Sequence, residues 1–142
     1  MALFVRQAAW LDAVPERDEK DKGPANTVSR RKALEDKNGP IEMPPLLCGD
    51  YLINFLYEVG PTMAAGMGAG PLTYVEIEAW QRANGIELMP WESALMRRLS
   101  CEYASESYAA MKRDRPAPFG GPPRTRRSVQ SEIERKLNSF LA

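Results

Sequence analysis

The stretch that decides the fold is residues 71–113, PLTYVEIEAWQRANGIELMPWESALMRRLSCEYASESYAAMKR. Its first helix has a clear start, because the hydroxyl of Thr73 can cap the backbone N–H of Glu76, and Glu76 can complete a capping box. Gly85 marks its end, since glycine adopts the left-handed conformation that follows many helices without a steric penalty. The apolar residues between these signals keep helical spacing: Tyr74, Ile77, Trp80 and Ala83.

A second helix is predicted to begin near Pro90, where the missing N–H of proline costs no hydrogen bond. It continues to about Arg113, because Pro116 and Pro118 prevent further helix. Its apolar stripe has spacings of three and four residues: Trp91, Ala94, Leu95, Leu99 and Tyr103. Only residues 86–89 connect the two helices, so we expect them to pack side by side as a helical hairpin.

A third helix is predicted over residues 46–59, with Asp50 as its N-cap or first-turn acid and Gly60-Pro61 as its stop. Its wide apolar stripe comprises Tyr51, Leu52, Phe55, Leu56 and Val59. This helix should cover the hairpin, so the sequence predicts a mainly α protein with a compact, all-helical three-helix body at residues 46–113. A body of this size buries only ~60% of its unfolded surface, so we expect self-association or partner binding to supplement its stability.

Residues 62–70, TMAAGMGAG, are predicted to be a flexible connector within this body. Their glycines resemble those of a phosphate-binding loop, but such a loop follows a strand, and here an amphipathic helix comes first. Met63 and Met67 either cover nearby core or offer adaptable apolar contacts to a partner.

The N-terminal part is predicted to consist of a helix and a linker. Residues 1–14 form a short amphipathic helix, which packs on its own protein or a neighbouring subunit, or else binds a partner. Residues 15–45 combine many charges of both signs with almost no apolar content, so they cannot offset a backbone entropy cost of roughly 1–2 kcal/mol per residue. We therefore expect a disordered linker there, with a short, frayed helix over 29–37.

The C-terminal part is predicted to be a spacer followed by a helix. Residues 114–127 are rich in Pro, Gly and Arg and have no means of forming a core. Arg124, Arg126 and Arg127 are candidates for salt contacts with this protein or a partner rather than with nucleic acid, because the helical body is acidic. Residues 128–142 form a terminal amphipathic helix whose apolar positions are Val129, Ile133, Leu137, Phe140 and Leu141.

Charge and composition argue against several classes of partner. The chain has 19 basic and 19 acidic residues, so no net field favours a nucleic acid or a membrane surface. The distribution is uneven: residues 46–111 hold three basic and eight acidic groups, and residues 112–142 hold eight basic and three acidic groups. No segment approaches the ~20 apolar residues of a transmembrane helix, and the N-terminal residues lack the features of a signal peptide. We therefore expect a soluble, cytoplasmic protein.

The residue types also argue against catalysis. The chain has no histidine, so no Ser–His or Cys–His pair can form and the commonest general base is missing. Cys48 and Cys101 lack metal-ligand spacing, and we expect reduced, buried thiols, with a disulfide between them as the alternative. A helix-turn-helix DNA reader is disfavoured, because Glu102 and Glu106 on the would-be recognition helix would repel phosphates. We predict no enzymatic activity, cofactor, metal or small-molecule substrate.

Three motifs resemble those of one known family: Thr73-Tyr74-x-Glu76-Ile77-x-Ala79-Trp80, Gly85-Ile86-x-Leu88-x-Pro90-Trp91-Glu92 and Arg98-Leu99-Ser100-x-x-Tyr103-x-x-Glu106. With the preceding helix, the Gly-rich loop and the Pro-rich exit, they make residues 44–119 similar to the tail assembly chaperones of long-tailed bacteriophages and prophages. These are short proteins encoded beside the tape measure gene. The resemblance implies a non-enzymatic protein in the host cytoplasm that keeps the tape measure protein soluble and recruits major tail tube subunits. Such proteins often occur as the downstream part of a frameshifted pair, so a longer form of the chain itself is a further expected partner.

Two alternatives to the chaperone function are a minor structural protein retained in the phage tail and a small DNA-binding regulator. Under the chaperone hypothesis, aromatic, Met and Arg side chains meet the partner. The candidates are Tyr74, Trp91, Tyr103, Tyr108, Met63, Met67, Arg124, Arg126 and Arg127. We expect Trp80 to seal the core between the helices, whereas Trp91 either does the same or meets the partner.

Overall fold

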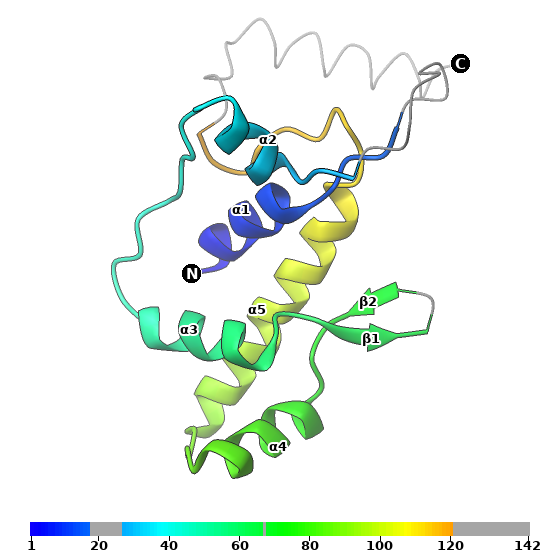
Figure 1. The fold of residues 1–142 in the computed structure, drawn as a ribbon. Helices are drawn as coiled ribbons and strands as arrows, with labels where there is room; N and C mark the ends of the chain where they lie inside the picture. Colours follow the sequence, from blue (N-terminus) through cyan, green and yellow to red (C-terminus); the bar gives the residue numbers. More distant parts are fainter. Residues whose placement is uncertain (18–26, 67, 121–142) are drawn as a thin grey trace, which may run out of the picture.

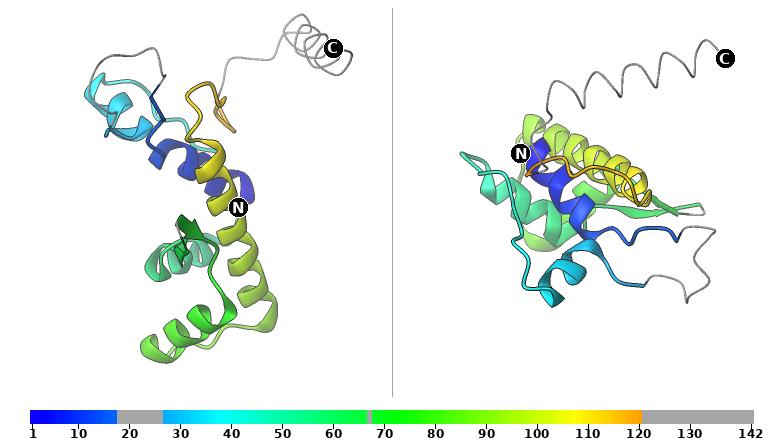
Figure 2. Two further views of the ribbon diagram at one scale, coloured as in Figure 1. Left: turned by 90° about the vertical axis from the view of Figure 1, so that its right-hand side faces the viewer. Right: turned by 90° about the horizontal axis from the view of Figure 1, so that it is seen from above.

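The computed structural model describes residues 1–17, 27–66 and 68–120, and these are mostly helical with a small antiparallel sheet (Figure 1). The elements in chain order are α1 (Ala2–Asp12), α2 (Arg30–Asp36), α3 (Asp50–Val59), β1 (Met63–Ala65), β2 (Gly68–Gly70), α4 (Tyr74–Asn84) and α5 (Pro90–Ala109). The longest of these is α5, and α1, α3 and α4 all pack against it. Figure 2 shows α3 and α4 together on one side of α5. The predicted C-terminal helix at 128–142 lies outside the described residues, and none of the described helices is long and apolar enough to span a bilayer.

The ends of α4 follow the local signals in the sequence, whereas α3 begins at Asp50, four residues after the predicted start at residue 46. The hydroxyl of Thr73 accepts a hydrogen bond from the backbone N–H of Glu76 at 3.3 Å. Gly85 ends α4 in the left-handed conformation, with φ of 63°. In α3, Asp50 is the first-turn acid and Gly60 follows the last residue. Helices α4 and α5 follow each other in the chain and contact each other.

Helix α5 begins at Pro90 as predicted, but it ends at Ala109, before the expected Arg113. Its buried residues are Met96, Leu99, Ser100 and Glu106. The predicted stripe is correct in part, because Leu99 is in the core and Leu95 and Tyr103 pack against it. Trp91 and Ala94, both placed in that stripe, are exposed. Aromatic and small residues occur on both faces of α5, so periodicity alone did not identify the face that meets the core.

The core includes the N-terminal helix. Its buried residues form one cluster: Val5, Leu52, Ile53, Leu56, Leu72, Ile77, Leu88, Met96 and Leu99. Helix α1 makes its most extensive contact with α5, and its small, buried Ala8 and Ala9 let the two helices approach closely. The first of the two possibilities for residues 1–14, packing on its own protein, is therefore the one observed. The compact body therefore extends beyond the predicted residues 46–113, because Val5 of α1 belongs to its core.

Polar side chains of α1 also hold the segments on either side of it. The buried carboxamide of Gln7 donates to the carbonyl of Glu42 at 3.0 Å and accepts the backbone N–H of Phe119 at 3.0 Å. The indole N–H of Trp10 donates to the carbonyl of Arg115 at 2.9 Å. Residues near 42 and near 115–119 are thus fixed to the same helix.

Residues 27–45 differ from the disordered linker that the sequence predicts. Ser29 caps α2, which matches the short helix expected over 29–37. The guanidinium of Arg30 lies 4.8 Å from the ring of Trp10 and donates to the carbonyls of Ala110 and Lys112 at the end of α5. These side chains find fixed partners instead of water, so high charge does not lead to an unstructured segment here.

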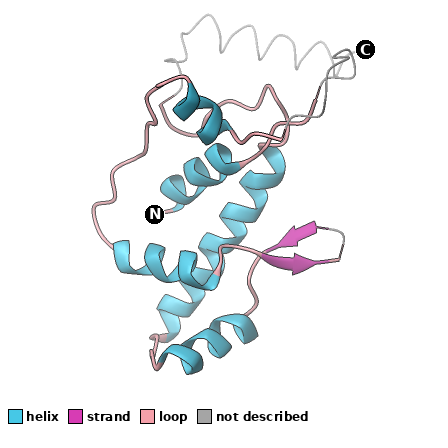
Figure 3. Cartoon of the chain, in the orientation of Figure 1, coloured by secondary structure: helices cyan, strands magenta, loops and turns pink. Residues whose placement is uncertain are grey.

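Residues 63–65 and 68–70 differ from the predicted flexible loop and break the all-helical pattern. Strands β1 and β2 pair in an antiparallel hairpin, in the register Met63↔Gly70, Ala64↔Ala69 and Ala65↔Gly68. Figure 3 shows this hairpin projecting from the helices. Its base is anchored by the buried hydroxyl of Ser100, which accepts the N–H of Leu72 and donates to the carbonyl of Pro61, both at 2.7 Å. Short runs of Ala and Gly carry no strand periodicity, so the sequence pattern could not reveal the hairpin.

Candidate protein-interaction surface

Large apolar side chains are exposed together where α5 begins. Tyr51 is 40% exposed, Met89 is 60% exposed and Trp91 is 57% exposed. The side chain of Glu92 links Tyr51 to Met89, because its carboxylate accepts both the O–H of Tyr51 and, at 2.7 Å, the backbone N–H of Met89. Trp91 directly precedes Glu92 in the chain. We call Tyr51, Met89 and Trp91 the corner surface, since they lie where the chain turns from α4 into α5.

Met89 points outward because of the conformation of the connector between α4 and α5. Its residues alternate in burial, as in an extended chain: Ile86 and Leu88 pack on the core, and Glu87 and Met89 are exposed. The carboxamide oxygen of Gln81 accepts the N–H of Leu88 at 2.7 Å and holds the connector in this conformation. An ordered backbone therefore presents Met89.

Aromatic rings connect the corner surface to the core. The ring of Tyr51 meets that of Phe55 edge-on at 5.8 Å, and Phe55 lies 5.0 Å from Trp80. Trp80 is partly buried against the core, as the sequence indicates. The hydrogen bond to Glu92, followed by burial, raises the pKa of Tyr51, so its phenol stays protonated at neutral pH. The exposed ring of Tyr51 is thus held in place by Phe55 and, through its hydroxyl, by Glu92.

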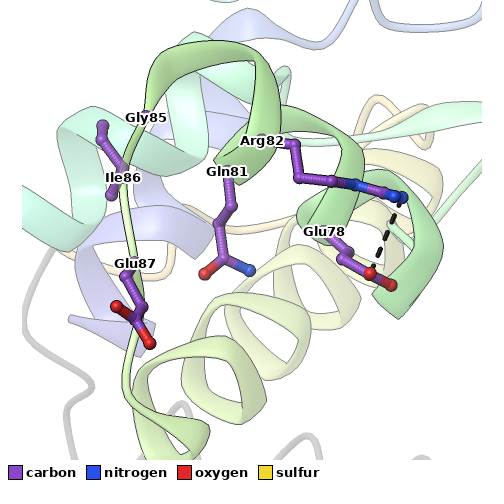
Figure 4. Close-up of a pocket in the computed structure, with 6 residues that line it drawn as sticks. All are labelled: Glu78, Gln81, Arg82, Gly85, Ile86 and Glu87. Atoms are coloured by element: carbon purple, nitrogen blue, oxygen red, sulfur yellow. Dashed lines mark ion pairs between the residues drawn. The ribbon is translucent and has the colours of Figure 1, made fainter.

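An open hollow of about 330 Å³ lies beside the connector (Figure 4). Its lining residues are Glu78, Gln81, Arg82, Gly85, Ile86 and Glu87. Figure 4 shows Glu78 and Arg82 paired at one side of it, at 3.6 Å, and Glu87 at the other. Gln81 accepts a backbone hydrogen bond from the connector, and Gly85 ends α4. We therefore regard the hollow as a by-product of the turn between α4 and α5.

Two other predicted partner residues, Tyr74 and Tyr108, are exposed on α4 and α5. Tyr74 is 55% exposed in the first turn of α4, with the guanidinium of Arg97 5.5 Å from its ring. Tyr108 is 78% exposed near the end of α5. At a rise of about 1.5 Å per residue, Tyr108 lies roughly 25 Å along α5 from Trp91. The predicted aromatic residues therefore do not form a single patch.

Tyr103 and Met63, two other predicted partner residues, are partly buried and make contacts within this protein. The O–H of Tyr103 donates to Asp12 at 3.2 Å, and Asp12 pairs with Arg31 at 2.7 Å. Burial, followed by the charge of Asp12, raises the pKa of Tyr103. Met63 is partly buried against the core. The remaining predicted partner residues lie outside the described part of the chain: Met67, Arg124, Arg126 and Arg127.

A buried carboxylate at the α1–α5 contact was not anticipated. Glu106 was predicted on a polar face, but it is only 3% exposed. Arg115 donates to both of its oxygens at 2.8 Å, and Arg6 donates to one at 3.1 Å. Burial favours the neutral acid, but the hydrogen bonds from Arg115 and Arg6 outweigh it, so the pKa of Glu106 lies below its ordinary value. No local pattern predicts this group, because its partners are distant in sequence.

The two cysteines are free, and the expectation of buried thiols needs correction: Cys48 is exposed and Cys101 is half-buried. Within the described ranges, no three His, Cys, Asp or Glu side chains are grouped as metal ligands would be. Arg97 donates a weak hydrogen bond to the sulfur of Cys101 at 3.7 Å.

No protein-family model matches the chain, and no curated protein or solved structure matches it. The resemblance to tail assembly chaperones therefore rests on the three motifs. Several motif residues serve as helix signals in the structure: Thr73 caps α4, Gly85 ends it, and Pro90 and Glu92 open α5.

Proposed function

We propose that this chain is a non-enzymatic assembly chaperone of a bacteriophage tail, which binds the tape measure protein and helps to recruit tail-tube subunits. The motif resemblance supports the identity of the client. The single structural observation that supports polypeptide binding is the corner surface, where Glu92 joins the exposed Tyr51 and Met89, and Trp91, the residue before Glu92, is also exposed.

The chemistry of this surface suits an apolar segment of another polypeptide. Aromatic residues and Met are enriched at protein interfaces, and the flexible thioether of Met89 adapts to irregular apolar surfaces. The rings of Tyr51 and Trp91 add rigid contact area at little entropic cost. Glu87 beside Met89 is exposed and acidic, so a client segment with apolar residues flanked by Lys or Arg would be complementary in charge.

Removal of the two most exposed side chains of the corner surface tests this function. We expect the double variant Met89→Ala/Trp91→Ala to bind soluble tape measure fragments about tenfold more weakly, since exposed aromatic anchors dominate such contacts. Isothermal titration calorimetry with fragments that together cover the tape measure protein measures the effect. Thermal melting should be unchanged, because both side chains are largely exposed.

Tyr108→Ala is the matched control, because Tyr108 is an even more exposed aromatic residue at the other end of α5. We expect it to bind the fragments as the unmodified chain does. Failure of the unmodified chain to bind any tape measure fragment would refute the proposed function. Binding that is lost in the control and kept in the double variant would move the client site away from the corner surface.

The second candidate, a minor structural protein of the tail, differs in its fate after assembly. An assembly chaperone leaves the finished particle, whereas a structural component stays in fixed copy number. Mass spectrometry of purified virions separates the two, and the chaperone assignment requires that peptides of this chain be missing. A DNA-binding regulator, the third candidate, requires DNA binding that weakens steeply with salt.

A further inference from the structure

The face of α5 that points away from the body carries a regular stripe. Its members recur at spacings of four and three residues: Ala94, Arg98, Cys101, Ser105 and Tyr108. All are exposed except Cys101, which is half-buried. Because α3 and α4 lie together on one side of α5, this helix forms an edge of the described body (Figure 2). Alternating spacings of four and three residues keep these positions in line along α5, so one neighbouring helix can contact all of them.

We infer that this stripe pairs with the same stripe of a second copy of this chain, in an antiparallel helix pair whose two-fold axis passes beside Cys101. A two-fold contact joins the same patch on both copies, so the patch must be complementary to itself. Both the sizes of the side chains along the stripe and the charges on and beside it meet this condition.

The sizes are complementary because Ala94 and Tyr108 lie equally far from Cys101, on opposite sides of it. Antiparallel pairing therefore sets Tyr108 of each copy over Ala94 of the other. The small alanine leaves room for the phenol ring, and the contact buries a side chain that is 78% exposed in a single copy. Parallel pairing would set two tyrosines together at one end and two alanines at the other, which crowds the first and leaves a gap at the second.

The charges favour the same orientation. Arg98 forms no ion pair within the described residues. The carboxylate of Glu102 is 35% exposed and lies 4.0 Å from Arg6, so it remains open to a further cation. Antiparallel pairing about Cys101 brings Arg98 of each copy close to Glu102 of the other, whereas parallel pairing brings like charges together.

This pairing leaves the corner surface uncovered. At about 1.5 Å per residue, Trp91 lies roughly 15 Å along α5 from Cys101, so the two corner surfaces would lie at opposite ends of the helix pair. The stripe spans about four helical turns, which is small for a protein interface. We therefore expect a dimer that forms at micromolar concentrations.

Disulfide trapping tests the pairing, because Cys101 lies beside the proposed axis. In the full chain carrying Cys48→Ser, mild oxidation should produce a dimer linked through Cys101. The matched control is Cys101→Ser, which keeps the more exposed Cys48. We expect the Cys101 thiol to form dimers about tenfold faster than the Cys48 thiol, because pairing raises the effective concentration of the two sulfurs. Equal or faster dimer formation through Cys48 overturns the inference.

A charge exchange provides a second, independent readout. In sedimentation velocity, Arg98→Glu and Glu102→Arg should each weaken the dimer about tenfold, and the double exchange should restore it, because it re-forms the pair with its signs reversed. Far-UV circular dichroism verifies that each variant is folded. A dimer dissociation constant that is the same in all these variants overturns the inference. So does a chain that stays monomeric at all concentrations, which would leave residues 121–142 or a different polypeptide as the occupant of the stripe.

Discussion

Leu11→Ala is expected to lower the free energy of unfolding by about 3 kcal/mol, because it removes a fully packed side chain and leaves a cavity. Leu11 is 1% exposed in α1, on the face that meets the body. A loss of this size is a large share of the ~5–15 kcal/mol that stabilises a typical domain. Urea denaturation followed by far-UV circular dichroism measures it.

Leu3→Ala is the matched control, since Leu3 lies in the same helix but is 42% exposed. The same change there should cost less than about 0.5 kcal/mol, as surface substitutions usually do. The contrast between the two leucines distinguishes an integral α1 from a terminal arm. If both variants unfold at the same urea concentration as the unmodified chain, α1 does not contribute to the core in solution.

Glu106→Gln is expected to lower the free energy of unfolding by about 2 kcal/mol at neutral pH, because it removes the charge that strengthens the hydrogen bonds from Arg115 and Arg6. The substitution keeps the shape of the side chain, so the loss reports on the charge. Urea denaturation at a series of pH values measures it.

The pH dependence of this effect has a definite sign. The pKa of Glu106 is lower in the folded protein than its ordinary 4.5, so the folded state favours the carboxylate. Its stabilisation is fully present above about pH 4.5 and is lost as the pH falls through the depressed pKa of the folded state. The difference in stability between the unmodified chain and Glu106→Gln should therefore shrink as the solution becomes acidic.

Glu102→Gln serves as the control for this measurement. Its carboxylate is 35% exposed and is 4.0 Å from Arg6, so water screens the pair and its loss should cost less than about 0.5 kcal/mol. Stability curves of the unmodified chain and Glu106→Gln that stay parallel through the acidic range would show that Glu106 is not ionised in the folded state.

The parts of the fold that the sequence predicts correctly depend on neighbouring residues. The cap at Thr73, the left-handed Gly85 and the start at Pro90 each act within one helical turn, so their signals are legible without any knowledge of tertiary contacts. The contact between α4 and α5 follows from them, because a connector of only five residues, 85–89, keeps the two helices close.

The parts that the sequence does not predict depend on distant residues. Glu106 is buried because Arg6 and Arg115 neutralise it, and nothing near Glu106 in the chain reveals Arg6 as its partner. Tyrosine is common at protein interfaces, but the hydroxyl of Tyr103 donates a hydrogen bond to Asp12 of α1, which is distant in sequence. Periodicity reveals that a helix has two faces, and only the neighbouring elements decide which face is covered.

The corner surface was predictable in part. Trp91 was a candidate partner residue and is exposed, but Tyr51 was placed in the apolar stripe of its helix, and Met89 was not singled out. The alternation of Ile86, Glu87, Leu88 and Met89 is the signal that identifies Met89, because an extended connector points every second side chain outward.

The bonds from Gln7 to Phe119 and from Trp10 to Arg115 join the two ends of the described chain. During translation, α1 is synthesised before the rest of the described chain, but α5 and residues 115–119, which hold it, come last. The apolar face of α1 therefore stays exposed to water until α5 has been synthesised. Contacts of such high sequence separation also raise the contact order, so we expect this protein to fold more slowly than a helical bundle with only local connections.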